Sequence, residues 1–342
     1  MNKIKLPLPQ SGGLILSYKC TAACRHCMYF CSPQWKADWF TEDDLIEFFS
    51  LLSRKINSSP WGNNSVSLNH GLHFSGGEPF LNYDLLWKAV EIAGEYNIPS
   101  TFVETNCFWC SSDETTREKL MNLKNAGLKG ILISVNPFYA EYIPFEQTER
   151  CIKISRDVFA ENVMIYQLDY YRQFKQLGIK QTISLEDYYK LIQNNYLTGS
   201  VEVEMFLMGR ANKSLRDFYP KYPREVLLSQ PCTTPVLRNW HNHFDNYGNI
   251  MPGYCGGVSL GSWRDINRLV DEGIDLEDKP VLRFLISEDI EMLYHFARDF
   301  GFRENPDGYL SKCDICFDIR RFLFETEKFD ELRPREFYLY SV

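Results

Sequence analysis

The sequence predicts a parallel α/β fold with a smaller C-terminal domain. Strand-like and helix-like segments alternate through the first two thirds of the 342 residues. Apolar residues in the helix-like segments recur at helical spacing. The length suits one large domain with an accessory piece. Such alternation is typical of parallel sheets, either doubly wound or closed into a barrel.

Six strands are expected, each a short run rich in apolar residues. Their ranges are 13–18, 67–75, 100–106, 129–136, 161–168 and 200–208. Helices are expected between them, over 41–56, 83–96, 112–127, 147–160 and 184–195. Thr41 is placed as an N-cap with Asp44 at the capping-box position, Asn82 opens the second helix and Gly127 closes the third.

The alternation stops near Gly209. Residues 231–263 are rich in Gly, Pro, Asn and aromatic residues and are interpreted as a loop with a turn at 246–249. Helical segments are expected near 264–272 and 287–300. We therefore expect two domains, residues 1–224 and residues 225–342.

The charge and hydropathy exclude some classes of protein. The net charge is 37 − 45 = −8, which disfavours duplex nucleic acid and a transfer RNA substrate. No signal peptide or run of about 18 apolar residues is present, so we expect a cytoplasmic protein without a membrane partner. In a reducing compartment, the eleven cysteines indicate metal or redox chemistry more than disulfides.

The first cysteine cluster follows the first expected strand. Cys20, Cys24 and Cys27 have the spacing C-x3-C-x2-C. Three thiolates on one loop can hold three irons of a four-iron cube and leave the fourth iron open to a small molecule. Spacing alone also fits structural zinc, with Cys31 or His26 as the fourth ligand.

A glycine-rich motif follows the second expected strand, in FSGGEPFL over 74–81. Gly76 and Gly77 allow close approach of backbone to a ligand, and the Glu78 carboxylate can bind an ammonium group. Alone, the motif is weak, because Gly and Pro after a strand usually form an ordinary turn.

Together, the two motifs in an alternating α/β chain resemble the radical S-adenosylmethionine (SAM) superfamily. The resemblance covers about residues 10–215. It implies a partial (β/α)6 TIM-like barrel, a [4Fe-4S] cluster on three cysteines, and SAM bound through its amino and carboxylate groups to the open iron. One electron then cleaves SAM to methionine and a 5′-deoxyadenosyl radical, which abstracts a substrate hydrogen.

The resemblance also assigns roles to residues. It makes Cys20, Cys24 and Cys27 cluster ligands and places Gly76, Gly77 and Glu78 at the SAM amino group. Glu104-Thr105-Asn106 matches a frequent E-T-N-G, with Cys107 in place of the glycine. Ser134 and Asn136 stand near the expected ribose position, where Asn136 replaces the usual acid. His26 stands where the family has an aromatic residue whose backbone faces adenine.

Four further cysteines lie in the second expected domain: Cys232, Cys255, Cys313 and Cys316. Four thiolates suffice for a saturated [4Fe-4S] cluster or for structural zinc. The glycines around Cys255 would let amides approach cluster sulfurs. The run from MGRA through D-x-x-G-N-I-x-P-x-x-C to C-x2-C resembles the SPASM/twitch extensions of radical SAM enzymes, and four cysteines fit the twitch type with one auxiliary cluster.

Other candidate residues are set aside at this stage. Cys31 is interpreted as a bystander, Cys107 and Cys110 as ordinary thiols, and Cys151 as a core residue. His241 and His243 are interpreted as polar contacts.

The expected function is a radical SAM oxidoreductase-type enzyme in which the auxiliary cluster assists oxidation of the substrate. The short N-terminus before Cys20 leaves no room for a leader-binding domain, which favours dehydrogenation of a small molecule. A ribosomal-peptide maturase performing cross-linking or epimerisation is the alternative. A flavodoxin or ferredoxin is the reductant that the resemblance implies. A non-catalytic zinc protein is the alternative from another class, and it leaves Glu78 unexplained.

Overall fold

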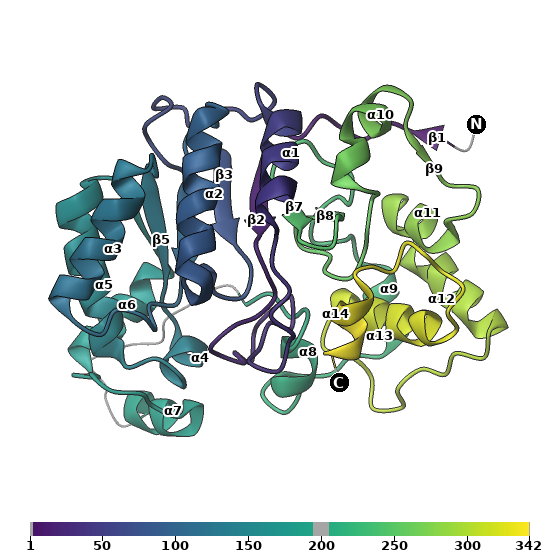
Figure 1. Cartoon of the computed structure of the whole chain (residues 1–342). Helices are drawn as coiled ribbons and strands as arrows, with labels where there is room; N and C mark the ends of the chain where they lie inside the picture. The colour runs from purple at the N-terminus through teal and green to yellow at the C-terminus, as the bar shows by residue number, and fades with distance from the viewer. Residues whose placement is uncertain (1–2, 194–204, 342) are drawn as a thin grey trace. The chain divides into compact units, whose positions relative to one another are not determined.

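The computed structural model describes residues 3–193 and 205–341 (Figure 1). The chain divides into two compact units. One, here called the sheet unit, comprises Gln10–Cys24 and Cys31–Glu204. The other, the C-terminal unit, comprises Met1–Pro9, Arg25–Phe30 and Met205–Val342. The boundary expected at residue 225 stays a prediction.

The sheet unit contains five parallel strands in the order β2-β3-β4-β5-β6. Their bounds are β2 Ser11–Ile15, β3 Gly71–Ser75, β4 Phe102–Thr105, β5 Gly130–Ser134 and β6 Val163–Tyr166. Each strand pairs with the next one in the sequence. A doubly wound sheet reverses its order at a switch point, and these five strands contain no reversal, so they favour the barrel type.

Helices connect these strands, and two more helices follow the last strand, β6. They are α1 Glu42–Leu52, η1 Pro79–Asn82, α2 Tyr83–Glu95, α3 Asp113–Asn125, α4 Pro137–Ala140, α5 Phe145–Phe159, α6 Leu168–Gln176 and α7 Leu185–Gln193. Helix α1 packs on α2, α2 on α3, and α3 on α5, which itself packs on β5 and β6. The helices therefore follow one another in the same order as the strands, as the α/β class predicts.

The predicted helix caps are confirmed. Thr41 accepts a hydrogen bond from the Asp44 amide at 3.1 Å, and the Asp44 carboxylate accepts one from the Thr41 amide at 3.3 Å. Asn82 caps α2 through the Leu85 amide at 3.2 Å. Gly127 follows α3 with φ of +116°. These short-range patterns fix where the covering helices begin and end.

Some expectations need correction. The strand expected over 67–75 begins only at Gly71, because Ser67 and His70 form a bridge across a turn. Helix α6 was not expected: it begins directly after Gln167, which has left-handed backbone with φ of +67°. Of the strand expected over 200–208, residues 200–204 lie outside the described residues, and 205–208 form no strand.

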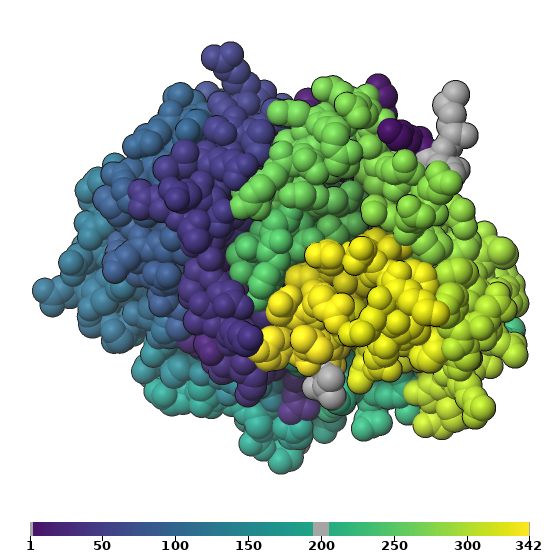
Figure 2. Space-filling model, turned by 45° about the vertical axis from the view of Figure 1, so that its right-hand side comes forward, coloured from purple at the N-terminus to yellow at the C-terminus, as the bar shows by residue number. Residues whose placement is uncertain are grey.

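The C-terminal unit consists of short elements. They are β1 Lys3–Ile4, α8 Ala211–Ser214, α9 Arg224–Leu228, β7 Asn242–Asp245, β8 Ile250–Pro252, η2 Trp263–Asp265, α10 Ile266–Asp271, β9 Ile274–Asp275, α11 Pro280–Ile286, α12 Ile290–Asp299, α13 Lys312–Glu325 and α14 Arg335–Leu339. Helix α12 packs on α11 and α13, and the yellow C-terminal residues lie against the lime-green ones in Figure 2.

The segment expected to be a loop over 231–263 is partly regular. Strands β7 and β8 pair antiparallel, with Phe244 opposite Ile250. The predicted turn at 246–249 joins them, and the Asp245 carboxylate accepts hydrogen bonds from the amides of Tyr247 and Asn249. Because its side chain satisfies these amides, the tight hairpin closes without a longer loop.

Candidate functional site

Polar residues gather at one edge of the sheet unit, where the parallel strands β3 and β4 end. Glu78 follows β3, and its buried carboxylate accepts hydrogen bonds from the Thr105 hydroxyl at 3.0 Å and the Asn106 amide at 2.8 Å. It also accepts one from the Phe80 amide at 3.2 Å and caps η1. The carboxylate therefore ties the loop after β3 to the end of β4.

Burial governs the protonation of this carboxyl group. Loss of solvent raises the pKa of Glu78 to about 7, although hydrogen bonds from Asn106, Phe80 and Thr105 lower it. Both protonation states are then populated near neutral pH. The assignment of Glu78 to the SAM amino group stays a prediction.

Gly76 and Gly77 bring the same loop against the segment that follows β2. The Gly77 amide donates to the Ser17 carbonyl at 2.8 Å, and the Glu78 amide donates to the Lys19 carbonyl at 3.0 Å. A Cβ on Gly76 would lie 2.2 Å from the Ser17 oxygen, and one on Gly77 would lie 2.0 Å from the Lys19 oxygen. These glycines therefore let the backbone of their loop approach the backbone of Ser17 and Lys19, and Lys19 directly precedes Cys20.

Cys20 is connected to the same edge. Its sulfur accepts hydrogen bonds from the Asn106 side-chain amide at 3.8 Å and from the Ala22 backbone amide at 3.5 Å. The Asn106 side chain also donates to the Thr21 hydroxyl at 3.0 Å. Hydrogen bonds to sulfur stabilise a thiolate, so this environment suits a metal-ligating cysteine.

The remaining motif residues are divided between the units. Cys24 is buried in the sheet unit, where the Tyr142 hydroxyl donates to the Ala23 carbonyl at 3.1 Å. Cys27 belongs to the C-terminal unit, where its carbonyl accepts from the Arg210 amide at 3.0 Å. That the three thiolates meet at one cluster stays a prediction.

His26 carries no charge at neutral pH. Burial and the nearby Arg210 guanidinium lower the pKa of His26 to about 4. The resemblance places the backbone at His26 beside adenine, and this assignment stays a prediction.

Ser134 ends β5, and Asn136 follows two residues later, at the same edge as Glu78 because the strands are parallel. Asn136 is fully buried and caps α4 by accepting from the amides of Phe138 at 3.0 Å and Tyr139 at 3.2 Å. Its side-chain nitrogen donates to Gln167 at 2.9 Å. Sequence reasoning missed Gln167. Its backbone just after β6 is left-handed, but a left-handed turn is expected from sequence only at glycine or asparagine.

The four C-terminal cysteines do gather. One cavity in the C-terminal unit is lined by Cys232, Cys255, Cys313 and Cys316. Its volume is about 670 Å³, which includes the space at its mouth that is open to solvent. Cys232 follows α9, Cys255 follows β8, and the other two lie on α13. Burial raises the pKa of Cys232 and of Cys255 to about 12. Neutral thiols are therefore expected there until a cation binds and displaces their protons.

Helix α13 orients two of these sulfurs. Ser311 caps the helix through the Asp314 amide at 3.1 Å, so Cys313 lies in the first turn and Cys316 one turn further on the same side. The positive end of a helix favours negative charge, which suits thiolates bound to a metal. The cavity, its four sulfurs and this helix end fit a four-cysteine [4Fe-4S] cluster or zinc equally well.

A buried arginine completes the electrostatics of this cavity. Arg320 donates to the Gly256 carbonyl at 2.8 Å and to the Tyr338 hydroxyl at 3.2 Å. Burial alone lowers the pKa of this group, but Tyr338 and Cys316 raise it above its usual value. The permanent cation suits an anionic four-thiolate site, which either iron–sulfur or zinc would form.

The glycines around Cys255 make room for side chains. A Cβ on Gly256 or Gly257 would lie 2.6 Å or 2.4 Å from the Phe337 ring. A Cβ on Gly253 would overlap the Arg238 guanidinium. The approach of amides to cluster sulfurs, expected from these glycines, stays a prediction.

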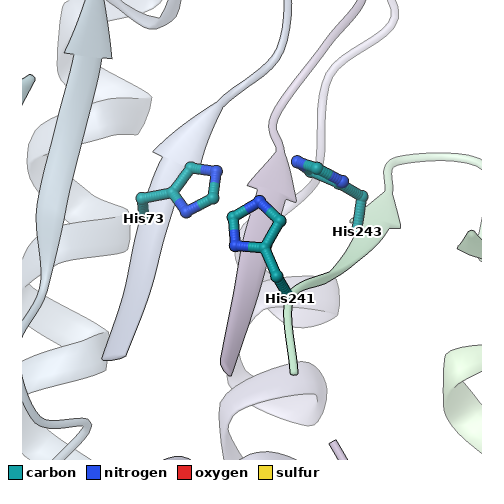
Figure 3. A group of neighbouring side chains, drawn as sticks. All are labelled: His73, His241 and His243. Carbon is teal, nitrogen blue, oxygen red and sulfur yellow. The ribbon is translucent and has the colours of Figure 1, made fainter. Parts of the chain in front are cut away.

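Histidines stand on two of the strands (Figure 3). His73 lies on β3, and burial lowers its pKa to about 3. His241 and His243, at the start of β7, have ring centroids 5.0 Å apart. The Tyr29 hydroxyl lies 2.9 Å from Nδ1 of His243. The expected polar contact is therefore confirmed for His243, although this residue lies on strand β7 and not in a loop.

No family model matches the chain. The putative peptide biosynthesis protein YydG of Bacillus subtilis (strain 168) is 24% identical over 141 residues, which are 41% of this chain and 40% of that protein. The chain thus matches well under half of the length of that curated relative.

Two solved structures are similar to the chain at low sequence identity. BtrN in complex with AdoMet and 2-DOIA has a TM-score of 0.43 and 14% identity, covering 80% of this chain and 89% of that chain. Native anSMEcpe with bound AdoMet has a TM-score of 0.44 and 12% identity, covering 93% and 98%.

The chain resembles radical SAM enzymes with a C-terminal auxiliary cluster domain. Its two motifs carry the resemblance, and the parallel strands and the gathered C-terminal cysteines agree with it. Among the described residues, no helix has the length and apolar character needed to cross a membrane.

Proposed function

We propose that the chain is a radical SAM enzyme with one auxiliary [4Fe-4S] cluster. The observation that carries the proposal is the connection of three motif loops: Asn106 donates through its side chain to Cys20 and through its backbone to Glu78. These residues follow three consecutive parallel strands, and ligands bind at such strand ends in α/β folds.

In this proposal, Cys20, Cys24 and Cys27 hold the first cluster. When bound there, a cluster with one open iron would supply the electron for cleavage of SAM to methionine and a 5′-deoxyadenosyl radical. The residues of the sheet unit orient the site: Asn106 holds the Cys20 sulfur, and Glu78 fixes the loop on which Gly76 and Gly77 lie. Ser134 and Asn136 border the ribose.

The auxiliary cluster is assigned to the four cysteines of the C-terminal cavity. The buried Arg320 guanidinium balances the net negative charge that four thiolates leave around an iron cube. Zinc with four thiolates carries the same net charge, so the resemblance, and not this charge, supports iron–sulfur over zinc. All four ligands come from this chain, so the cluster would be saturated. Its role is to accept an electron during oxidation of the substrate.

The substrate class has two candidates. A peptide is favoured by the curated relative, which is named a putative peptide biosynthesis protein. A small molecule undergoing dehydrogenation is the candidate that the sequence favoured. A flavodoxin or ferredoxin in the cytoplasm is the proposed reductant.

Anaerobic purification with iron, sulfide and zinc analysis tests this proposal. The parent should contain about eight irons per chain, as two cubes require. The Cys20→Ala/Cys24→Ala/Cys27→Ala variant should contain about four and lose 5′-deoxyadenosine formation from SAM and dithionite. Cys31→Ala is the matched control, because it lies outside the spacing and should keep both. Zinc without iron, and no SAM cleavage after reconstitution, would instead support the non-catalytic zinc protein.

A further inference from the structure

Three cysteines of the sheet unit form a cluster that the proposed function does not use. Cys107 and Cys110 lie on the loop after β4, and Cys151 lies on α5. All three are fully buried, and their sulfur atoms lie within 4.8 Å of one another. The sequence predicts ordinary thiols at Cys107 and Cys110 and a core residue at Cys151, and its spacing does not link Cys151 to the other two.

The loop that presents two of the sulfurs is held firmly. The Cys107 amide donates to the Thr105 hydroxyl at 3.0 Å, and the Cys110 amide donates to the Cys107 carbonyl at 3.1 Å. The Arg150 guanidinium, next to Cys151 in the chain, donates to the Cys110 carbonyl at 2.6 Å. The loop and α5 are therefore joined beside the sulfurs.

Cys107 also has strained backbone. Its φ of +71° is left-handed, a conformation that is unfavourable for a residue with a Cβ. In the E-T-N-G pattern that residues 104–107 resemble, glycine stands at the position of Cys107. Strain at a buried thiol that meets two others is a reason to look for a role for that thiol.

The spacing and number of the sulfurs define the ligand they would suit. Thiolates at about 2.3 Å from one ion lie about 4 Å apart, which agrees with the cluster. A four-iron cube would separate its cysteines further, since irons and sulfides stand between them. Zinc prefers four ligands, and among the described residues this group offers three. Three thiolates alone are the donors that Cu(I) prefers.

We propose that Cys107, Cys110 and Cys151 bind a single Cu(I) ion. On binding, each thiol releases its proton to solvent and each sulfur donates an electron pair to the ion. The ion and its three thiolates carry a net charge of −2. Two features offset part of this charge: the Arg150 guanidinium, which also pairs with Asp113 at 3.0 Å, and the positive end of α3, which Ser112 caps two residues after Cys110.

The site would also stiffen the proposed SAM site without being part of it. Cys107 directly follows Asn106, whose backbone amide donates to Glu78. An ion that fixes Cys107 against α5 therefore fixes the loop that carries Asn106. The copper proposal itself does not depend on the iron–sulfur assignment, because it uses none of those seven cysteines.

Copper retention under competition tests the proposal. The full chain, reconstituted anaerobically with iron and sulfide, is equilibrated with Cu(I) buffered by excess bicinchoninate, desalted and analysed for copper and iron. We expect one copper per chain with unchanged iron, and an X-ray absorption spectrum showing three sulfur neighbours. Each of three variants, Cys107→Ser, Cys110→Ser and Cys151→Ser, should weaken Cu(I) binding at least about 100-fold. Loss of a group that only hydrogen-bonds to a metal ligand typically weakens binding by about 10- to 100-fold.

Cys31→Ser is the matched control, since it is a buried cysteine outside the group and should retain one copper. The single variants are compared at equal iron content and with circular dichroism matching the parent, so that a fold defect is recognised. Copper retention equal in the parent and all three variants overturns the proposal. Retention of Zn(II) in preference to Cu(I) overturns the choice of ion.

Discussion

The Asn106 backbone amide donates a 2.8 Å hydrogen bond to the buried carboxylate of Glu78. Because the Asn106 side chain reaches the Cys20 sulfur, one residue connects the first cysteine motif with the glycine-rich motif. The two sequence signals that carry the resemblance are therefore parts of one hydrogen-bonded network at the end of β4.

Removing the Glu78 carboxylate should destabilise the sheet unit. Glu78→Ala leaves the buried Thr105 hydroxyl and the amides of Phe80 and Asn106 without their acceptor. An unsatisfied buried group costs roughly 1–3 kcal/mol, so we expect a loss of about 3 kcal/mol or more in unfolding free energy, measured by denaturant titration. Glu78→Gln keeps an acceptor oxygen and should lose clearly less; equal losses would contradict this account.

The same carboxyl group should give stability a pH dependence of unusual sign. Its pKa is about 7 in the folded chain and near 4.5 when unfolded, so the folded state binds more protons between these values. Stability should therefore fall as pH rises from about 4.5 to about 7, by up to about 1.4 kcal/mol per pH unit, and level off above. The difference between the parent and Glu78→Gln isolates this contribution. Parallel pH profiles for the two would show that burial does not shift this pKa.

Asn106 should tune the first cluster of the proposed enzyme. Asn106→Ala removes the donor to the Cys20 sulfur and leaves the backbone bond to Glu78 in place. Loss of a hydrogen bond to a cluster sulfur makes the reduction potential more negative, so we expect a lower potential by redox titration and slower formation of 5′-deoxyadenosine. Thr21→Val removes only the Asn106 to Thr21 bond and should leave the potential unchanged. A potential that moves equally in both variants would argue against a direct effect on the sulfur.

Arg320 should tune the auxiliary cluster in the same direction. Arg320→Met removes a buried cation next to Cys316 and Cys255, which makes addition of an electron less favourable. We expect a more negative potential for the auxiliary cluster alone, resolved by electron paramagnetic resonance during redox titration. Arg321→Met is the matched control, because that side chain is partly exposed and pairs with Glu325. If the first cluster shifts as well, the assignment of Arg320 to the auxiliary site fails.

Short-range patterns predicted most of the sheet unit. Thr41 with Asp44, Asn82, and Gly127 mark helix ends by local hydrogen bonds or backbone needs, and such signals are legible in a single sequence. Helix α6 was missed because Gln167 makes a left-handed turn that sequence assigns to glycine or asparagine. Tertiary contacts, which include its bond to Asn136, hold that conformation.

Long-range contacts limited what could be predicted of the site. The four C-terminal cysteines were grouped from spacing and resemblance, and their common cavity agrees. Cys151 could not be grouped with Cys107, because only the packing of α5 on α3 brings them together. The sequence likewise did not indicate that Glu78 accepts hydrogen bonds from other residues of the chain, because a carboxylate that follows a strand can face either a ligand or the chain itself.

The composition of the C-terminal unit has a consequence for protein engineering. Its strand β1 pairs with β9, and its segment Arg25–Phe30 places Phe30 against Phe337 at 5.3 Å between ring centroids. The chain enters this unit three separate times. A fusion made at one junction after residue 204 would therefore transplant the unit without two of its three pieces. Exchange of this unit with another protein would have to carry the N-terminal strand and part of the cysteine loop as well, so the unit is not a module that recombines by a single crossover.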